Sequence, residues 1–133
     1  MTHTASGTFV VSLTPMPFEG ADPEFKLARM SIDKQISGDL TASTMGQMLS
    51  AMTGTEGSAG YVAMERVTGT LHGKQGSFVL QHTGTMNRGG QSLEITVVPD
   101  SGTGELVGLA GEFTIDIVDG DHFYEFSYRL LDR

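Results

Sequence analysis

The stretch EFTIDIVDGDHFYEF, residues 112–126, decides the fold that this sequence predicts. Apolar and polar residues alternate on both sides of Asp119-Gly120, a dipeptide that the type I′ turns of tight hairpins favour. Folding the stretch at that turn puts Phe113 opposite Phe126 on an apolar face, and the other face is polar. One buried and one solvated face are typical of an antiparallel pair, so a β-hairpin is predicted here.

A glycine-rich segment, SGTGELVGLAG at residues 101–111, comes directly before this hairpin. A dinucleotide-binding or Walker loop must lead into a helix, whose N-terminus binds the phosphate. Here a strand pattern follows, and the third glycine comes one position late for Gly-x-Gly-x-x-Gly. We therefore expect no nucleotide cofactor, and we expect structural roles in a turn for Gly102, Gly104 and Gly111.

The rest of the 133-residue chain continues the alternation. Eighteen glycines and recurring Thr, Val and Ile favour many short strands joined by tight turns. We expect a single all-β domain over residues 1–133, folded as a sandwich or as a closed barrel of about eight strands. The predicted strands are Ser6–Thr14, Phe25–Ser37, Leu40–Thr53, Ser58–Leu71, Ser77–Met86, Ser92–Val98, Gly111–Val118 and Asp121–Leu131.

Residues 43–53 fit two structures. Apolar residues fall there at the helical spacing i, i+3, i+4 and i+7, namely Met45, Met48, Leu49 and Met52. A glycine inside the segment and its short length oppose a helix, and the surrounding alternation favours a strand. The pattern leaves both alternatives open.

A second hairpin brings two chemically active side chains together. Gly73-Lys-Gln-Gly76 separates two alternating runs and is predicted to form their turn. On this register Val67 lies opposite His82, and Glu65 lies diagonally from His82 on an otherwise apolar face. A carboxylate beside an imidazole in a poorly solvated space could act as a general acid/base pair. The alternatives are a buried, satisfied polar pair and a pair in water at a barrel mouth.

Aromatic and aliphatic residues on the same apolar faces are candidates for binding a small ligand. An eight-stranded barrel has an interior just wide enough to be filled by side chains or to hold one small molecule. The alternative is that these residues form the core, with tyrosine hydroxyls bonded to backbone carbonyls. The candidate ligand-binding residues are Tyr61, Phe78, Leu80, Phe113, Tyr124 and Phe126.

Composition and charge exclude several classes of partner. The formal net charge is −8, which disfavours nucleic acid and anionic membrane surfaces. The sequence MTHTASGTFVV at residues 1–11 has neither the basic nor the apolar region of a signal peptide. The chain contains no cysteine, so there is no disulfide framework to indicate secretion. We therefore expect a cytoplasmic protein. No metal site and no cofactor are expected, because the histidines are scattered at His3, His72, His82 and His122.

The glycine-rich segment 101–111 resembles the turn before a late strand in dirigent proteins and allene oxide cyclases. The chain after about residue 25 resembles more closely a bacterial family of uncharacterised proteins assigned to that barrel superfamily. The resemblance implies a small antiparallel eight-stranded barrel, commonly oligomeric in the named relatives, and it transfers no catalytic residue. The matching pieces are Ser37–Leu40, Met64–Leu71, Gly76–Gly84 and Gly102–Leu106.

Three functions follow as hypotheses. The first is a barrel that binds one small, mostly apolar molecule in its lumen. The second is a cofactor-free cyclase or isomerase, in which Glu65 and His82 act as acid/base with help from Tyr124. The third is a non-catalytic homo-oligomer or partner-binding protein, with Phe123 and residues 45–52 as contact points.

Overall fold

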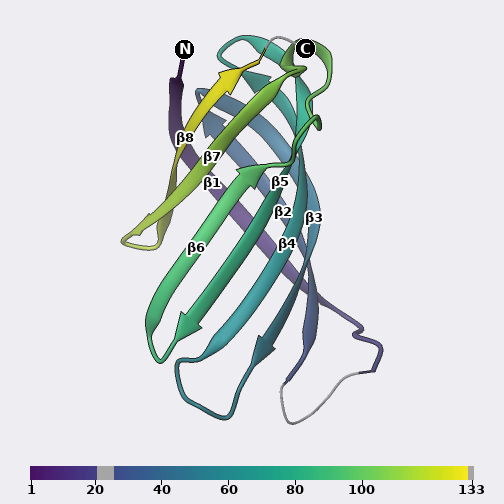
Figure 1. Ribbon diagram of the computed structural model, residues 1–133, viewed down its shortest axis with the longest axis vertical. Coiled ribbons are helices and arrows are strands. Elements are labelled where there is room, and N and C mark those ends of the chain that lie inside the picture. The colour runs from purple at the N-terminus through teal and green to yellow at the C-terminus, as the bar shows by residue number, and fades with distance from the viewer. Residues whose placement is uncertain (21–25, 132–133) are drawn as a thin grey trace.

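The computed structural model describes residues 1–20 and 26–131 and shows a closed antiparallel β-barrel of eight strands (Figure 1). Each strand pairs with the next along the chain, and β1 pairs with β8. The all-β prediction is confirmed, although the predicted start of the second strand, Phe25, lies outside the described residues. The elements are β1 (His3–Met16), β2 (Ala28–Gly38), β3 (Leu40–Met52), β4 (Ala59–Leu71), β5 (Lys74–Asn87), β6 (Gly90–Val97), the short 3₁₀ helix η1 (Gly104–Leu106), β7 (Leu109–Val118) and β8 (Asp121–Leu130).

The segment that fitted two structures is a strand. All of β3 pairs with β4, from Leu40 opposite Leu71 to Met52 opposite Ala59. Its side chains alternate, so that Thr44 is buried inside the barrel whereas Met45 is exposed on the outside. Pairing with β2 and β4 on both sides therefore outweighs the helical spacing of the methionines.

The β4–β5 turn differs from the prediction. The hairpin closes with Leu71 opposite Lys74, so the turn is the two-residue pair His72-Gly73. Both have positive φ, 46° and 80°, as a type I′ turn requires. The predicted Gly73–Gly76 turn and its register are wrong by four residues, because histidine signals a left-handed turn position less clearly than asparagine or glycine does.

The predicted proximity of Glu65 and His82 does not depend on this correction. A shift by an even number of residues keeps every side chain on its predicted face. Glu65 is opposite Leu80, and His82 is opposite Ala63, so Glu65 and His82 are still diagonal neighbours on the inner face. In the β7–β8 hairpin the predicted register is confirmed, including Phe113 opposite Phe126.

The upper half of the barrel, at the end where both termini lie in Figure 1, is filled by aromatic side chains. Phe126 stacks on Phe78 with ring centroids 5.7 Å apart, and it also contacts Phe113 at 5.5 Å. The glycine-rich segment covers β5 and inserts Leu106, which is fully buried in this core. This half of the lumen is therefore a packed core.

Gly102 and Gly104 lie in the connection before β7, as predicted, whereas Gly111 lies inside β7, opposite Tyr128, and not in the turn. A Cβ atom on Gly102 would lie 1.9 Å from the carbonyl oxygen of Leu106, and one on Gly111 would lie 2.5 Å from the carbonyl oxygen of Ser127. Gly104 has a φ of 59°, in the left-handed region. The segment therefore needs glycine for close backbone approach and for one turn conformation.

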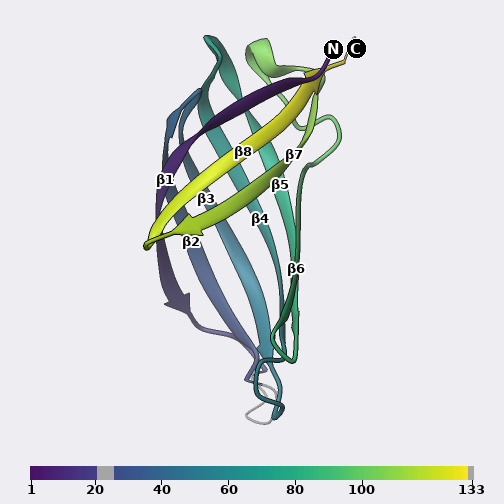
Figure 2. The same cartoon turned by 90° about the vertical axis from the view of Figure 1, so that its left-hand side faces the viewer.

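The lower half of the barrel is less completely closed. The β7–β8 hairpin turns back well short of the lower ends of the other strands, as Figures 1 and 2 show. The pairing of β1 with β8 covers His3–Phe9, and β6 pairs with β7 at Thr96 opposite Glu112. In the described residues, the lower parts of β1 and β6 therefore have no partner across this side of the barrel.

Candidate functional site

A layer of polar side chains crosses the lumen beneath the aromatic core. Four neighbouring strands each contribute one inward-facing member, and all four residues are buried: Lys34 of β2, Thr44 of β3, Glu65 of β4 and His82 of β5. These positions follow the same alternation that points Ile36 and Val67 inward, so the strand pattern itself places the polar groups inside. Buried charges require partners, and the layer supplies them.

The Glu65 carboxylate is the centre of this polar layer. Its Oε1 accepts hydrogen bonds from Lys34 Nζ at 3.1 Å and from His82 Nε2 at 2.9 Å. Its Oε2 accepts one from the Thr44 hydroxyl at 2.7 Å. Lys34 Nζ also lies 4.8 Å from the centroid of the Phe9 ring, so its charge contacts an aromatic face.

These contacts keep Glu65 ionised. Burial by itself would raise the pKa of this carboxyl, but the hydrogen bond from His82, the charge of Lys34 and the hydrogen bond from Thr44 together lower the pKa to about 2. An ionised carboxylate can only accept hydrogen bonds. Glu65 therefore orients His82 and carries negative charge into the barrel.

Tyr61 extends the layer toward the lower end. Its hydroxyl lies 3.3 Å from His82 Nδ1, on the ring edge opposite the contact with Glu65. Burial and the charge of Glu65 raise the pKa of the Tyr61 hydroxyl, so it stays protonated. The ring packs over Gly84, where a Cβ atom would come within 2.3 Å of Tyr61 Cε1. The Tyr61 ring can therefore occupy this position only because residue 84 has no side chain.

A cavity of about 360 Å³ lies at the lower end and includes Tyr61 in its wall. Its other side chains are mainly small or apolar, and several that face inward are nevertheless exposed, including Met52 and Leu93 at 54 and 47 %. The inward-facing lining residues are Met48, Ser50, Met52, Ala59, Tyr61, Gly84, Met86, Gln91 and Leu93.

The predicted site residues divide between the two halves of the barrel. Glu65, His82 and Tyr61 are connected by hydrogen bonds at the inner end of the cavity. The Tyr124 hydroxyl instead lies 3.0 Å from the Ser37 carbonyl oxygen and accepts from the backbone N–H of Leu40 at 3.0 Å. The remaining predicted ligand-binding residues are buried in the upper core: Phe78, Leu80, Phe113 and Phe126.

Three residues of the polar layer and its surroundings were not predicted as part of the site. Lys34 and Thr44 occupy inward positions of strands whose alternation was recognised, so counting parity from Ile36 and Ala42 would have revealed two polar residues inside the barrel. Gly84 had no local signal, because its role depends on the Tyr61 ring of the neighbouring strand.

A second tyrosine–histidine–carboxylate arrangement occurs at the upper rim. His72 Nδ1 is hydrogen-bonded to the Tyr128 hydroxyl, and His72 Nε2 lies 3.7 Å from Asp39 Oδ2. Here the His72 and Asp39 side chains are 38 and 46 % exposed, whereas those of His82 and Glu65 are 4 and 0 % exposed. Water screens the rim arrangement, so it is a structural counterpart without the enclosed environment.

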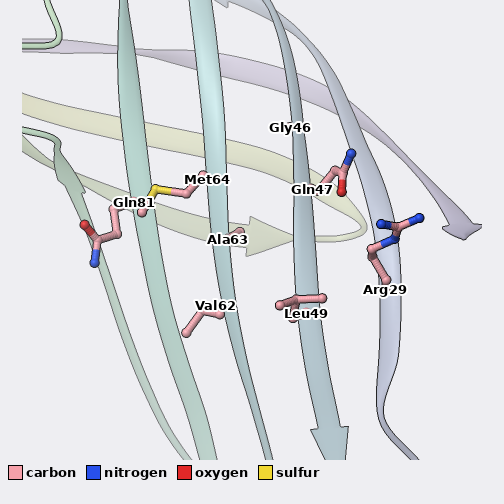
Figure 3. Close-up of a pocket in the computed structure, with 8 residues that line it drawn as sticks. All are labelled: Arg29, Gly46, Gln47, Leu49, Val62, Ala63, Met64 and Gln81. Atoms are coloured by element: carbon pink, nitrogen blue, oxygen red, sulfur yellow. The ribbon is translucent and has the colours of Figure 1, made fainter. Parts of the chain in front are cut away.

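The outer face of β3–β5, with Arg29 of the neighbouring β2 at its edge, has a shallow hollow of about 570 Å³, which Figure 3 shows with its lining side chains. Exposed apolar residues form much of it, including Leu49, Val62 and Met64. Nε of Arg29 is buried there without a hydrogen-bond partner among the described residues. Among residues 1–20 and 26–131, no helix is long and apolar enough to cross a membrane.

Comparisons with known proteins agree with the fold. The family model described as "Protein of unknown function (DUF3224)" matches residues 5–128. A crystal structure of a protein of unknown function from this family, from Shewanella oneidensis MR-1, has 48% sequence identity and a TM-score of 0.95, covering 99% of this chain and 100% of that one. No curated protein matches the chain. The finer resemblance to allene oxide cyclases stays a prediction.

Proposed function

The chain belongs to the DUF3224 family, and we propose that its barrel binds one small, mostly apolar molecule in the lower cavity. The observation that supports this most is an accessible apolar space that ends at a buried, hydrogen-bonded polar layer. Ligand sites commonly combine an apolar lining with a few fixed polar groups. The volume of about 360 Å³ lies within the usual range for such sites.

The composition of the cavity wall supports the same proposal. Met48, Met52 and Met86 are flexible and polarizable, so they adapt to the shape of a guest. Part of their apolar surface is exposed, and Met52 and Met86 are 54 and 38 % exposed. Covering this surface with an apolar ligand would be favourable by roughly 25 cal/mol per Å².

The test is a titration with N-phenyl-1-naphthylamine, a neutral apolar dye whose fluorescence rises when it leaves water. We expect saturable binding by the wild type and loss of binding by Ala59→Phe, which fills the cavity. The matched control is Val62→Phe on the outer face of the same strand, where we expect unchanged binding. Equal binding by Ala59→Phe and the wild type would contradict the proposal.

The hydrogen-bonded chain Tyr61–His82–Glu65 supports a second candidate, a cofactor-free isomerase or cyclase. In such a reaction a C–H bond next to a substrate carbonyl breaks, its bonding pair forms the enolate, and its proton goes to the Tyr61 oxygen while the Tyr61 proton moves to His82 Nδ1. The resulting imidazolium is stabilised by Glu65. Return of a proton to the enolate at carbon completes the exchange. Deuterium incorporation into 2-tetralone, followed by NMR in D₂O, would test this. A rate equal to that of the Tyr61→Phe variant would contradict it.

The outer face of β3–β5 supports a further candidate role, self-association with a second copy of the chain. The chain carries sixteen acidic residues, yet between residues 40 and 87 the acids are Glu56 in a turn and Glu65 inside the barrel. Two such faces can therefore approach without carboxylate repulsion, and their exposed apolar side chains can cover each other. A partner would also supply an acceptor for Arg29 Nε.

Sedimentation velocity tests this association. We expect the wild type to sediment as an oligomer and Met64→Glu to sediment as a monomer, because the new charge lies in the apolar hollow. Thr68→Glu, at an exposed outward position of the same strand, is the matched control and should leave the oligomer intact. A wild type that is monomeric at every concentration would contradict the proposal.

A further inference from the structure

In the hydrogen bonds of the polar layer, the donor and the acceptor can each be assigned, starting from Glu65. The ionised carboxylate accepts from Lys34, Thr44 and His82. His82 Nε2 therefore carries a proton, and in the neutral imidazole Nδ1 is then an acceptor. The tautomer is set by the contact with the carboxylate, as in other His–carboxylate pairs.

Tyr61 is the next residue in this series of hydrogen bonds. Its hydroxyl lies 3.3 Å from His82 Nδ1 and has one proton to donate, which goes to that nitrogen. The lone pairs of the Tyr61 oxygen stay available, and Tyr61 is a half-buried wall residue of the cavity. The inner end of the cavity thus presents a hydrogen-bond acceptor that is polarised by the carboxylate behind it.

From this direction we infer that the lower cavity takes a neutral, mostly apolar alcohol or phenol, whose hydroxyl donates to the Tyr61 oxygen. The inference rests on the proposed binding function and adds the chemical class of the ligand. An anionic ligand is disfavoured, because the buried positive charge of Lys34 is already paired with Glu65 and is not available to a second carboxylate. An ether or ketone of the same shape offers no proton to the Tyr61 oxygen.

The test compares three ligands with one ring system at about pH 8. They are 2-naphthol, a donor, 2-methoxynaphthalene, which has no donor, and 2-naphthoate, an anion. We expect 2-naphthol to bind about tenfold more tightly than 2-methoxynaphthalene, the difference that one hydrogen bond makes. We expect 2-naphthoate to bind most weakly.

The Tyr61→Phe variant links the preference to one oxygen. We expect its affinity for 2-naphthol to fall to that for 2-methoxynaphthalene, with the latter unchanged, which also shows that the variant is folded. Tyr128→Phe makes the same substitution at the upper rim and should keep the wild-type preference. Equal affinities of the wild type for the first two ligands, or tightest binding of 2-naphthoate, would overturn the inference alone. Failure of all three to bind would overturn the proposed function.

Discussion

Glu65 and Lys34 lie inside the barrel with side-chain exposures of 0 and 7 %, joined at 3.1 Å. Burying two charges is unfavourable, and their attraction offsets this only when further hydrogen bonds complete the site. Thr44 and His82 supply those bonds to Glu65. At the scale of single residues, the polar layer is therefore interdependent, and removing either charge alone leaves the other without its partner.

This interdependence predicts a specific loss of stability in acid. The pKa of Glu65 is lowered from 4.5 to about 2 in the folded protein. Its contribution to the free energy of unfolding is therefore complete above pH 4.5 and disappears as the pH falls toward 2. The lost free energy of unfolding is on the order of 3 kcal/mol. Urea unfolding across this pH range measures it.

Two variants isolate the contribution of Glu65. The double variant Glu65→Gln, Lys34→Met removes both charges together, and we expect its stability to lose this acid dependence. Glu94→Gln changes an exposed carboxyl on β6 and should keep it. An unchanged acid slope in the double variant would show that Glu65 is not the titrating group.

The close contact between Gly84 and the Tyr61 ring gives a second prediction at the scale of a single residue. Ala at this position would place Cβ 2.3 Å from Tyr61 Cε1, so the ring must leave the position in which its hydroxyl contacts His82 Nδ1. We expect Gly84→Ala to destabilise the protein by about 1–3 kcal/mol and to abolish the preference for 2-naphthol. Gly60→Ala is the control, because its Cβ would have no neighbour closer than 3.9 Å. Retained preference in Gly84→Ala would contradict the assigned role.

At the scale of elements, strand parity was predictable and one turn was not. Alternation placed Glu65 and His82 on the inner face, and it still does so after the four-residue change of register. The true turn was hidden because His72 occupies a left-handed position that Asn or Gly usually takes. Its hydrogen bond to Tyr128, distant in sequence, accompanies this conformation.

The turn itself gives an element-scale prediction. Gly73 has a φ of +80°, and a Cβ atom added there would meet no other atom within 4 Å, so Gly73→Ala tests backbone conformation alone. We expect a loss of about 1 kcal/mol in the free energy of unfolding. Gly54→Ala, equally open but without a positive φ, should be close to neutral. Equal effects of the two substitutions, measured by chemical unfolding, would contradict the assigned turn.

At the scale of the whole molecule, the sequence indicated a barrel but not its division into two halves. Strands β7 and β8 are short, so their hairpin ends before the lower half of the barrel. Of the aromatic residues predicted to contact a ligand, all except Tyr61 fill the upper half instead. Which part of a lumen is filled depends on how side chains from distant strands meet, as with Phe78 and Phe126. Local patterns do not contain that information.

The most direct test of the account is methionine methyl NMR during a titration with 2-naphthol. Strands β3–β5 carry some methionines that face into the barrel and others that face outward, so the outward methionines serve as an internal control. We predict that the methyl signals of Met48, Met52 and Met86 shift with binding, while those of Met45 and Met64 on the outer face stay in place. Shifts confined to Met45 and Met64, or no shift at any methionine, would contradict binding in the lower cavity.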